Sequence, residues 1–216
     1  MREIAVTSTM SGIGKTFISS ILTVGLVRRF KRAVLFSCTQ FTEEGKEIAE
    51  KLCDGTYVYK YEWKGHEFIV INNELSSVYE DYLSSVHEVR RYCLERDIEL
   101  LIMDIPGDIS YARSVIKGVD VLLFVYTPLE DNFVADIVNK LLRFSPHLVL
   151  IRNYSREGIL KVNYVDYMPY VICYVPFIEE VDKVEMLRDL LNKTIDLKIY
   201  TKFSSLVKMI AEWCSS

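Results

Sequence analysis

The sequence predicts an α/β fold, in which a doubly wound, mostly parallel sheet carries helices on both faces. Three observations lead to this. Short apolar runs typical of buried strands alternate with longer segments of helical periodicity. The first strand is followed directly by a glycine-containing loop and a helix. No linker, repeat or low-complexity tract interrupts the 216 residues, so we expect residues 1–216 to form a single domain.

Composition narrows the class of protein. Hydrophobic residues make up 50% of the chain and charged residues 26%, which indicates a globular protein. The net charge of −4 gives no overall electrostatic reason to bind nucleic acid, although a local basic patch is compatible with it. Five scattered cysteines without a C-x-x-C pair predict reduced thiols in a cytoplasmic protein. We expect neither a signal peptide nor a membrane span, because Met1-Arg2-Glu3 leads directly into an apolar strand and no apolar run approaches ~20 residues.

In the first half of the chain, apolar spacing separates strands from helices. The expected strands are residues 2–8, 33–36, 57–63 and 67–71, of which the last two form a hairpin turning at Lys64-Gly65-His66. The expected helices are residues 15–30, Thr42 to about Leu52, and Ser76 or Ser77 to about Arg96.

The second half continues the alternation. The expected strands are residues 99–104, 119–126, 147–151 and 170–175. Thr127-Pro128-Leu129-Glu130 has the spacing of a capping box with proline at the first helical position, so a helix is expected to follow. Two more helices are expected over residues 180–191 and 201–213. The last has few positive charges opposite its apolar stripe, which favours packing on the sheet over binding to a membrane surface.

Parallel strands end at one edge of a sheet, and ligands of such folds bind there. Residues with polar or glycine character follow several of the expected strands. They are residues 9–16, 37–40 and 104–108, Thr127-Pro128 and Asn153. The sequence therefore predicts that these segments converge on the loop after the first strand.

The loop from Ser11 to Thr16 has the features of a phosphate-binding loop. Gly12 and Gly14 let the backbone approach a phosphate, and the N-terminus of the next helix adds partial positive charge. Lys15 is placed to bind the β- and γ-phosphates, and the Thr16 hydroxyl to hold Mg²⁺. The candidate binding residues of this loop are Ser11, Gly12, Ile13, Gly14, Lys15, Thr16 and Phe17. The full G-x-x-x-x-G-K-[ST] pattern is not met, because Thr9 stands at its first glycine.

Asp104 ends an apolar strand in the middle of the chain. A carboxylate at this place can support a magnesium ion and its water shell, and the N–H of Gly107 is available for a γ-phosphate. Thr16 and Asp104 are therefore the candidate metal residues, and Lys15 and Asp104 the candidate catalytic ones. The alternative for Asp104 is an ordinary residue of a turn at a strand end.

In their order, these motifs resemble the MinD/ParA-type ATPases of the P-loop NTPases. Residues 6–16, VTSTMSGIGKT, resemble that family's V-T-S-G-K-G-G-V-G-K-T. Residues 101–107 resemble its strand followed by D-T-P, and residues 119–130 resemble its A-D-x-x-x-x-V-x-x-P-E. The resemblance implies an ATP·Mg²⁺ site in which Asn153 reads the adenine edge and Pro176 lies near the base. It also implies a homodimer partner and a role in partition or in positioning DNA or cellular structures.

Two departures from the family bear on hydrolysis. The family's signature lysine falls at Met10, and its D-x-D at Ser37-Cys38-Thr39. Without these charges we expect slow or partner-stimulated ATP hydrolysis, unless Gln40, Glu43 or Glu44 substitutes. ATP is favoured over GTP because Asn153-Tyr154-Ser155-Arg156 lacks the Lys and Asp of N-K-x-D.

The leading hypothesis is a nucleotide-dependent switch. One alternative is a non-hydrolysing nucleotide-binding scaffold, and another is an ATP-dependent ligase similar to dethiobiotin synthetase. Arg28, Arg29, Lys31 and Arg32 follow the first helical segment. They are either charges that complement the helix dipole or a contact for an adaptor protein or the DNA backbone.

Overall fold

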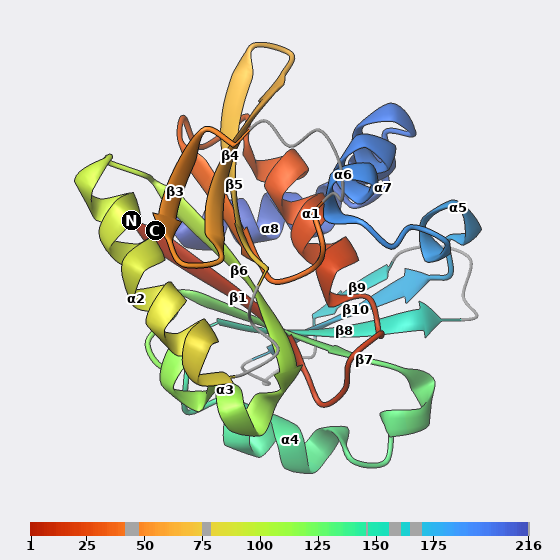
Figure 1. The fold of residues 1–216 in the computed structure, drawn as a ribbon. Coiled ribbons are helices and arrows are strands. Elements are labelled where there is room, and N and C mark those ends of the chain that lie inside the picture. The colour runs from red at the N-terminus through yellow and green to blue at the C-terminus, as the bar shows by residue number, and fades with distance from the viewer. Residues whose placement is uncertain (42–47, 75–78, 146, 156–160, 165–169, 216) are drawn as a thin grey trace.

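The computed structural model describes residues 1–41, 48–74, 79–145, 147–155, 161–164 and 170–215. Within these residues, ten strands form one sheet (Figure 1). The strands are β1 (Arg2–Ser8), β2 (Ala33–Ser37), β3 (Glu50–Cys53), β4 (Thr56–Trp63), β5 (His66–Asn73), β6 (Leu100–Asp108), β7 (Val121–Tyr126), β8 (His147–Ser155), β9 (Lys161–Tyr164) and β10 (Tyr170–Pro176).

The strand order is β3-β4-β5-β2-β6-β1-β7-β8-β10-β9. Seven neighbouring strands in this order all run parallel to one another: β5, β2, β6, β1, β7, β8 and β10. Antiparallel pairing is confined to the two edges, where β3 and β4 extend one side and β9 the other. The predictions of a mostly parallel sheet and of the β4–β5 hairpin are confirmed, whereas the antiparallel pairs β3–β4 and β9–β10 were not predicted. Strand β1 lies near the middle of the sheet.

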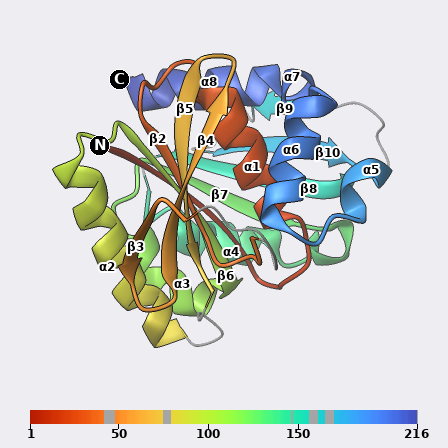
Figure 2. The same ribbon diagram turned by 45° about the horizontal axis from the view of Figure 1, so that its top comes forward.

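Helices cover both faces of the sheet (Figures 1 and 2). One face carries α1 (Lys15–Leu26), α6 (Leu187–Asp196), α7 (Ile199–Lys202) and α8 (Ser204–Ser215), and the other carries α2 (Tyr79–Glu95), α3 (Ile109–Ile116) and α4 (Val134–Leu141). Alternate residues of β1 divide between the two cores: Ile4 and Val6 pack under α1, and Ala5 packs toward α2. This alternation is why the central strands read as continuous apolar runs in the sequence.

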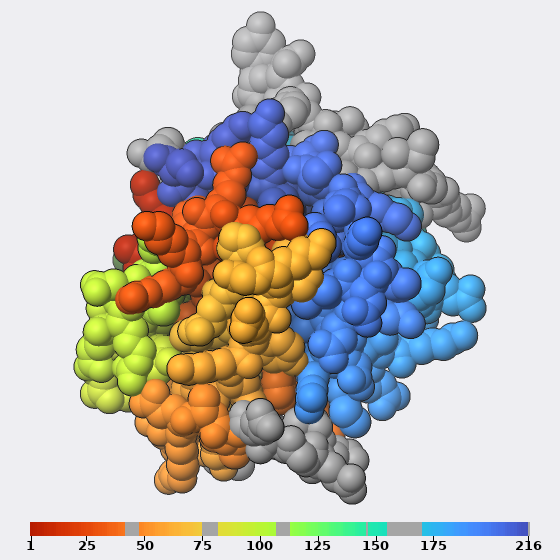
Figure 3. Space-filling view, turned by 90° about the horizontal axis from the view of Figure 1, so that it is seen from above, coloured from red at the N-terminus to blue at the C-terminus, as the bar shows by residue number. Residues whose placement is uncertain are grey.

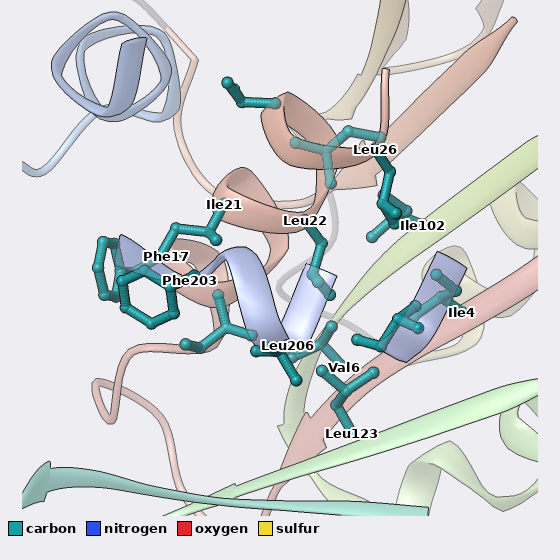
Figure 4. Packing of buried hydrophobic residues seen from close by; sticks show 14 of the residues in the cluster. Ile4, Val6, Phe17, Ile21, Leu22, Leu26, Ile102, Leu123, Phe203 and Leu206 are labelled. Carbon is teal, nitrogen blue, oxygen red and sulfur yellow. The ribbon is translucent and has the colours of Figure 1, made fainter. Parts of the chain in front are cut away.

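The apolar contacts of α1 fix the position of this helix and therefore of the candidate loop that leads into it. Phe17 on α1 packs edge to face against Phe203, with ring centroids 5.8 Å apart (Figure 4). At Gly25 the helix approaches α8 closely, because a Cβ there would lie 2.6 Å from Cγ2 of Val207. The C-terminal helix α8 thus packs on the sheet, as expected, and buries Leu206 and Ile210.

The β4–β5 hairpin adds an aromatic contact to this layer. Its surface lies beside that of the C-terminal helices (Figure 3). Trp63 packs edge to face against Tyr200, with ring centroids 4.9 Å apart, and the Arg28 guanidinium lies 5.0 Å from the Trp63 ring centroid. The hairpin therefore contributes to the same core as α1.

Several predicted elements differ from the structure. The helix expected from Thr42 to Leu52 is wrong where it can be compared, because β3 begins at Glu50; residues 42–47 lie outside the described part. The proposed caps Ser76 and Ser77 also lie outside it. Helix α1 ends at Leu26, so the basic residues 28–32 follow the helix and do not complement its last turn.

The C-terminal helices are broken where the sequence indicated continuous ones. The region of residues 180–191 divides into α5 (Glu179–Asp182) and α6, and that of residues 201–213 into α7 and α8. The capping box closes a short 3₁₀ turn, η1 (Pro128–Glu130), and α4 starts four residues later at Val134. Helix α3 and strand β9 had no sequence prediction.

Candidate nucleotide-binding site

The loop between β1 and α1 follows the central strand and leads into a helix N-terminus. Gly12 and Gly14 have φ angles of 74° and 92°, a left-handed conformation that glycine adopts readily. Gly14 also needs its small size, because a Cβ would lie 2.3 Å from Nδ2 of Asn153. The carbonyl of Gly14 then accepts the N–H of Ile18 at 3.1 Å, which opens α1. The two glycines predicted for the loop therefore have different physical roles.

Lys15 lies inside the loop and is largely shielded from solvent. Its Nζ donates to Oγ of Ser8 and to the carbonyl oxygen of Met10, both at 3.0 Å. Burial lowers the pKa of the Lys15 ammonium, and the negative charge of Asp104 partly opposes that shift. A buried cation held by neutral oxygens is a site that an anion would stabilise.

Thr16 and Asp104 are in direct contact at the start of α1. Oγ1 of Thr16 donates to Oδ2 of Asp104 at 2.7 Å, and Oγ of Ser37 donates to the same oxygen at 2.8 Å. Oγ1 of Thr39 lies 2.9 Å from Oγ1 of Thr16. Burial raises the pKa of Asp104, while its hydrogen bonds and Lys15 lower it. The structure thus brings together three segments that are far apart in the sequence.

This oxygen cluster fits a magnesium ion by its chemistry. Mg²⁺ prefers oxygen ligands and is held by one or two carboxylates or hydroxyls together with water and substrate phosphates. Thr16 and Asp104 supply a hydroxyl and a carboxylate, with the Ser37 and Thr39 hydroxyls beside them. A bound cation would also stabilise the buried Asp104 carboxylate. The two predicted metal residues are therefore suitably placed to hold it.

Asn72 is a buried residue of this region that the sequence analysis missed. It lies beside Ser37 in the parallel register of β5 and β2. Its Nδ2 donates to the carbonyl oxygens of Ser37 at 2.9 Å and Thr39 at 2.7 Å. The Asn72 side chain thus holds the turn that carries the two hydroxyls. Only the pairing of β5 with β2 reveals this, since the sequence shows an ordinary asparagine at a strand end.

A cavity of about 300 Å³ adjoins the loop. One side is formed by the loop and Thr39, and another by Asn153, Tyr154 and Pro176. The remaining wall is largely apolar. Its side chains are Ile178, Val181, Asp182, Val184, Glu185, Met186 and Leu190. Such a concave, mainly apolar wall beside a phosphate-type loop is suited to a planar base. The α5–α6 segment that supplies it carried no sequence signal for a site.

The predicted site residues occupy different parts of this region. Gly12, Gly14, Lys15, Thr16, Phe17, Asn153 and Pro176 line the cavity, whereas Ser11 is exposed in the loop and Ile13 is buried beneath it. Nδ2 of Asn153 donates to the carbonyl oxygen of Ile13 at 2.9 Å, so this amide also supports the loop. Its role in reading a base stays a prediction.

The basic residues after α1 are not part of this cavity. Arg28, Arg29, Lys31 and Arg32 are exposed. The Arg32 guanidinium donates to the carbonyl oxygen of Arg96 at 2.6 Å, at the end of α2. Because α1 begins at the loop and ends near these residues, they lie at the opposite end of that helix from the site.

The first half of the loop contacts the turn after β7. The Thr9 hydroxyl donates to Oε1 of Glu130. The other carboxylate oxygen, Oε2, accepts the backbone N–H of Thr127 at 2.9 Å and lies 3.3 Å from the Thr127 hydroxyl. Glu130 was predicted as a capping residue of its own turn, and the cap is confirmed. Its contact with the loop was not foreseen.

Together, the strand order, the glycine loop before α1 and the Lys15, Thr16 and Asp104 arrangement define a P-loop NTPase fold. No protein-family model matches the chain, and no curated protein matches it in sequence. Among the described helices, none has both the length and the apolar character needed to cross a membrane.

Solved structures of MinD and McdA share this architecture over almost the full chain. A variant of Cyanothece McdA in complex with ATP matches with a TM-score of 0.60 and 16% identity, covering 100% of this chain and 96% of that one. The MinC:MinD cell division protein complex of Aquifex aeolicus matches at 0.60 and 14%, covering 97% and 96%. The septum site-determining protein MinD with Mg-ADP from Pyrococcus horikoshii OT3 matches at 0.50 and 16%, covering 98% and 94%. The protein therefore has the MinD/ParA-type P-loop fold.

Proposed function

We propose that this protein binds ATP·Mg²⁺ and uses it as a conformational switch, in a role that positions DNA or another cellular structure. The observation that carries the proposal is the 2.7 Å hydrogen bond from Thr16 to Asp104. Thr16 directly follows Lys15 in the sequence, and the ammonium of Lys15 is buried. A hydroxyl, a carboxylate and an ammonium at one helix N-terminus support the proposal that Thr16 and Asp104 bind the metal and Lys15 the phosphates. The positioning role rests on the similarity of fold to MinD and McdA.

In the proposed complex, Lys15 binds the β- and γ-phosphates and the loop N–H groups surround them. Thr16 and Asp104 hold Mg²⁺, which neutralises phosphate charge. The base occupies the cavity between Pro176 and the α5–α6 segment, and Asn153 is the proposed contact for its edge. Nucleotide binding by proteins of the same fold supports this arrangement, since the McdA structure is an ATP complex and the MinD structure contains Mg-ADP.

Hydrolysis is proposed to be slow or partner-stimulated. Phosphoryl transfer depends on positioned charge and an oriented water. At the end of β2 the described residues offer the Ser37 and Thr39 hydroxyls in place of carboxylates, and both are engaged with Asp104 or Thr16. Met10 carries no charge that could reach a phosphate. The protein is proposed to hold its nucleotide for long periods, and a scaffold that does not hydrolyse at all is the limiting case.

Titration calorimetry with ATP and Mg²⁺ tests the proposal, with Lys15→Ala as the decisive variant. Because a hydrogen bond to a charged group contributes about 1.5–3 kcal/mol, the loss of Lys15 is expected to weaken binding roughly 10- to 150-fold. Lys208→Ala is the matched control, since Lys208 is an exposed lysine on α8 whose ammonium lies 3.9 Å from Glu212. Equal ATP affinity in wild type and Lys15→Ala would refute the phosphate assignment.

A single-turnover assay then separates the switch from the scaffold. Radiolabelled ATP is bound to an excess of protein and followed over hours. Slow release of phosphate supports a switch that resets by hydrolysis. Bound ATP that stays intact supports the scaffold.

A further inference from the structure

Glu130 uses its two carboxylate oxygens for two different elements. Oε2 accepts the N–H of Thr127 at 2.9 Å and so closes the η1 turn. Oε1 accepts the hydroxyl of Thr9, which belongs to the loop after β1. The Glu130 side chain is buried, so water competes little for either contact. One side chain thus joins the loop to the turn after β7.

The contact depends on a residue peculiar to this loop. Thr9 stands at the position where the G-x-x-x-x-G-K-[ST] pattern has glycine, and glycine has no hydroxyl to donate. The Thr9 side chain therefore gives the first half of the loop an anchor that the pattern itself would not provide.

The same half of the loop is held from inside by Lys15. Nζ of Lys15 donates to the carbonyl of Met10, the residue next to Thr9, and to Oγ of Ser8. The Ser8 hydroxyl in turn donates to the Met10 carbonyl. An anion in the loop would draw the ammonium toward itself, because a charge-assisted bond to phosphate is stronger than bonds to neutral oxygens. Met10 would then lose one of its two hydrogen-bond donors.

The turn at the other end of the contact presents apolar side chains to solvent. Leu129 is 86% exposed and Phe133 is 63% exposed, on either side of the buried Glu130. A shift of Glu130 would move both, since Glu130 lies within η1 and Phe133 donates its N–H to the Glu130 carbonyl at 2.9 Å.

We propose that Glu130 is a positioning residue for the phosphate-binding loop and that, through Thr9, it links occupation of the loop to the conformation of residues 127–133. The inference rests on the proposed nucleotide site and adds the route by which bound phosphate alters a surface. The contacts run without a gap from Lys15 to Met10 and Thr9, and then to Glu130 and Thr127. Linkage is reciprocal, so a ligand on residues 127–133 would change the affinity of the loop for phosphate by the same factor.

Hydrogen exchange of residues 127–133, with and without ATP·Mg²⁺, tests the link. The key variant is Thr9→Val, which removes the hydroxyl while keeping the shape and leaving the Glu130 cap intact. Thr9→Ser retains the donor and serves as the conservative control. Thr201→Val is a matched change on α7, where the exposed hydroxyl donates to the Lys198 carbonyl at 2.6 Å.

In wild type, Thr9→Ser and Thr201→Val, ATP·Mg²⁺ is expected to change the exchange rate of residues 127–133. In Thr9→Val this change is expected to disappear, while ATP affinity falls by no more than about tenfold, the size of one hydrogen bond. An undiminished change in Thr9→Val overturns the link and leaves the nucleotide site standing. Failure of wild type to bind ATP overturns both.

Discussion

The amide nitrogen of Asn72 lies 2.9 Å from the carbonyl oxygen of Ser37, across the parallel pair β5 and β2. The same nitrogen donates to the Thr39 carbonyl at 2.7 Å. An asparagine from the hairpin therefore fixes the turn whose hydroxyls meet Asp104 and Thr16. The hairpin, which lies outside the loop and its helix, is in this way connected to Thr16 and Asp104, the proposed metal-binding pair.

Asn72→Ala is expected to weaken the Mg²⁺-dependent part of ATP binding, because the Ser37–Thr39 turn loses two hydrogen bonds. The free energy of unfolding should also fall by about 1–3 kcal/mol, since the buried Ser37 carbonyl and the partly buried Thr39 carbonyl each lose a donor. Calorimetry with and without Mg²⁺ and urea unfolding measure the two effects.

Asn73→Ala is the control for Asn72, because its amide donates to Thr56 at 3.1 Å, away from the site. It should destabilise the protein while leaving the ratio of ATP affinities with and without Mg²⁺ unchanged. Equal changes of this ratio in both variants would show that Asn72 acts through stability alone.

Asp104→Asn is expected to stabilise the ligand-free protein at neutral pH. Burial raises the pKa of Asp104 above its unfolded value, so between these two values the native state binds more protons than the unfolded state. The contribution of Asp104 to the free energy of unfolding is fully present below the pKa of the unfolded state, near 3.9. It is lost as the pH rises through the pKa of the folded state. The advantage of Asp104→Asn should therefore shrink as the pH falls toward 4.

The order should reverse when nucleotide and Mg²⁺ are present, because the amide cannot replace the carboxylate charge beside the metal. Thermal unfolding of both proteins across pH 4–8, with and without ATP·Mg²⁺, measures this. A pH-independent difference between them would contradict the raised pKa.

Gly14→Ala should be more harmful than Gly12→Ala. Both positions have positive φ, and an alanine in that region costs about 1–2 kcal/mol. At Gly14 the new Cβ would also lie 2.3 Å from Asn153 Nδ2, whereas at Gly12 no atom lies within 4 Å. The expected loss of unfolding free energy is about 1–2 kcal/mol for Gly12→Ala and at least about 1 kcal/mol more for Gly14→Ala.

Urea unfolding and ATP titration compare these two glycine variants directly. Gly14→Ala should also weaken nucleotide binding more, since Asn153 would be displaced from the Ile13 carbonyl. Equal effects of the two substitutions would mean that Asn153 moves aside freely.

Gly25→Ala tests the packing of α1 on α8. The added methyl group would meet Val207 at 2.6 Å, and overpacking of this kind costs about 1–3 kcal/mol. Alanine gains about 1 kcal/mol of helix propensity over glycine, so a net loss of up to about 2 kcal/mol is expected.

The effect of Gly25→Ala on the free energy of unfolding should change sign when Val207 is also replaced by alanine. In the Val207→Ala background the clash is absent, and Gly25→Ala should then stabilise by about 1 kcal/mol through helix propensity. Unfolding of the four proteins of this double-mutant cycle gives the coupling energy. Additive effects would show that α1 and α8 are not in contact at this point.

The parts predicted well from the sequence are those with local signals. The loop from Gly12 to Thr16, the capping box at Thr127 and the alternating strands depend on neighbouring residues. Predictions were poorer where a short segment had ambiguous periodicity. Residues 50–53 form a strand because β4 pairs with them, and the region after Pro176 divides into the helices α5, α6, α7 and α8.

The sequence by itself determined the class of fold and the glycine loop before α1, because glycine conformation, helix N-termini and apolar periodicity act over a few residues. The tertiary structure decided which distant groups meet that loop. Asn72 reaches the Ser37 turn because β5 lies beside β2, and Glu130 reaches Thr9 because β7 lies beside β1. These contacts join residues 35 and 121 positions apart, so only the strand order could place them together.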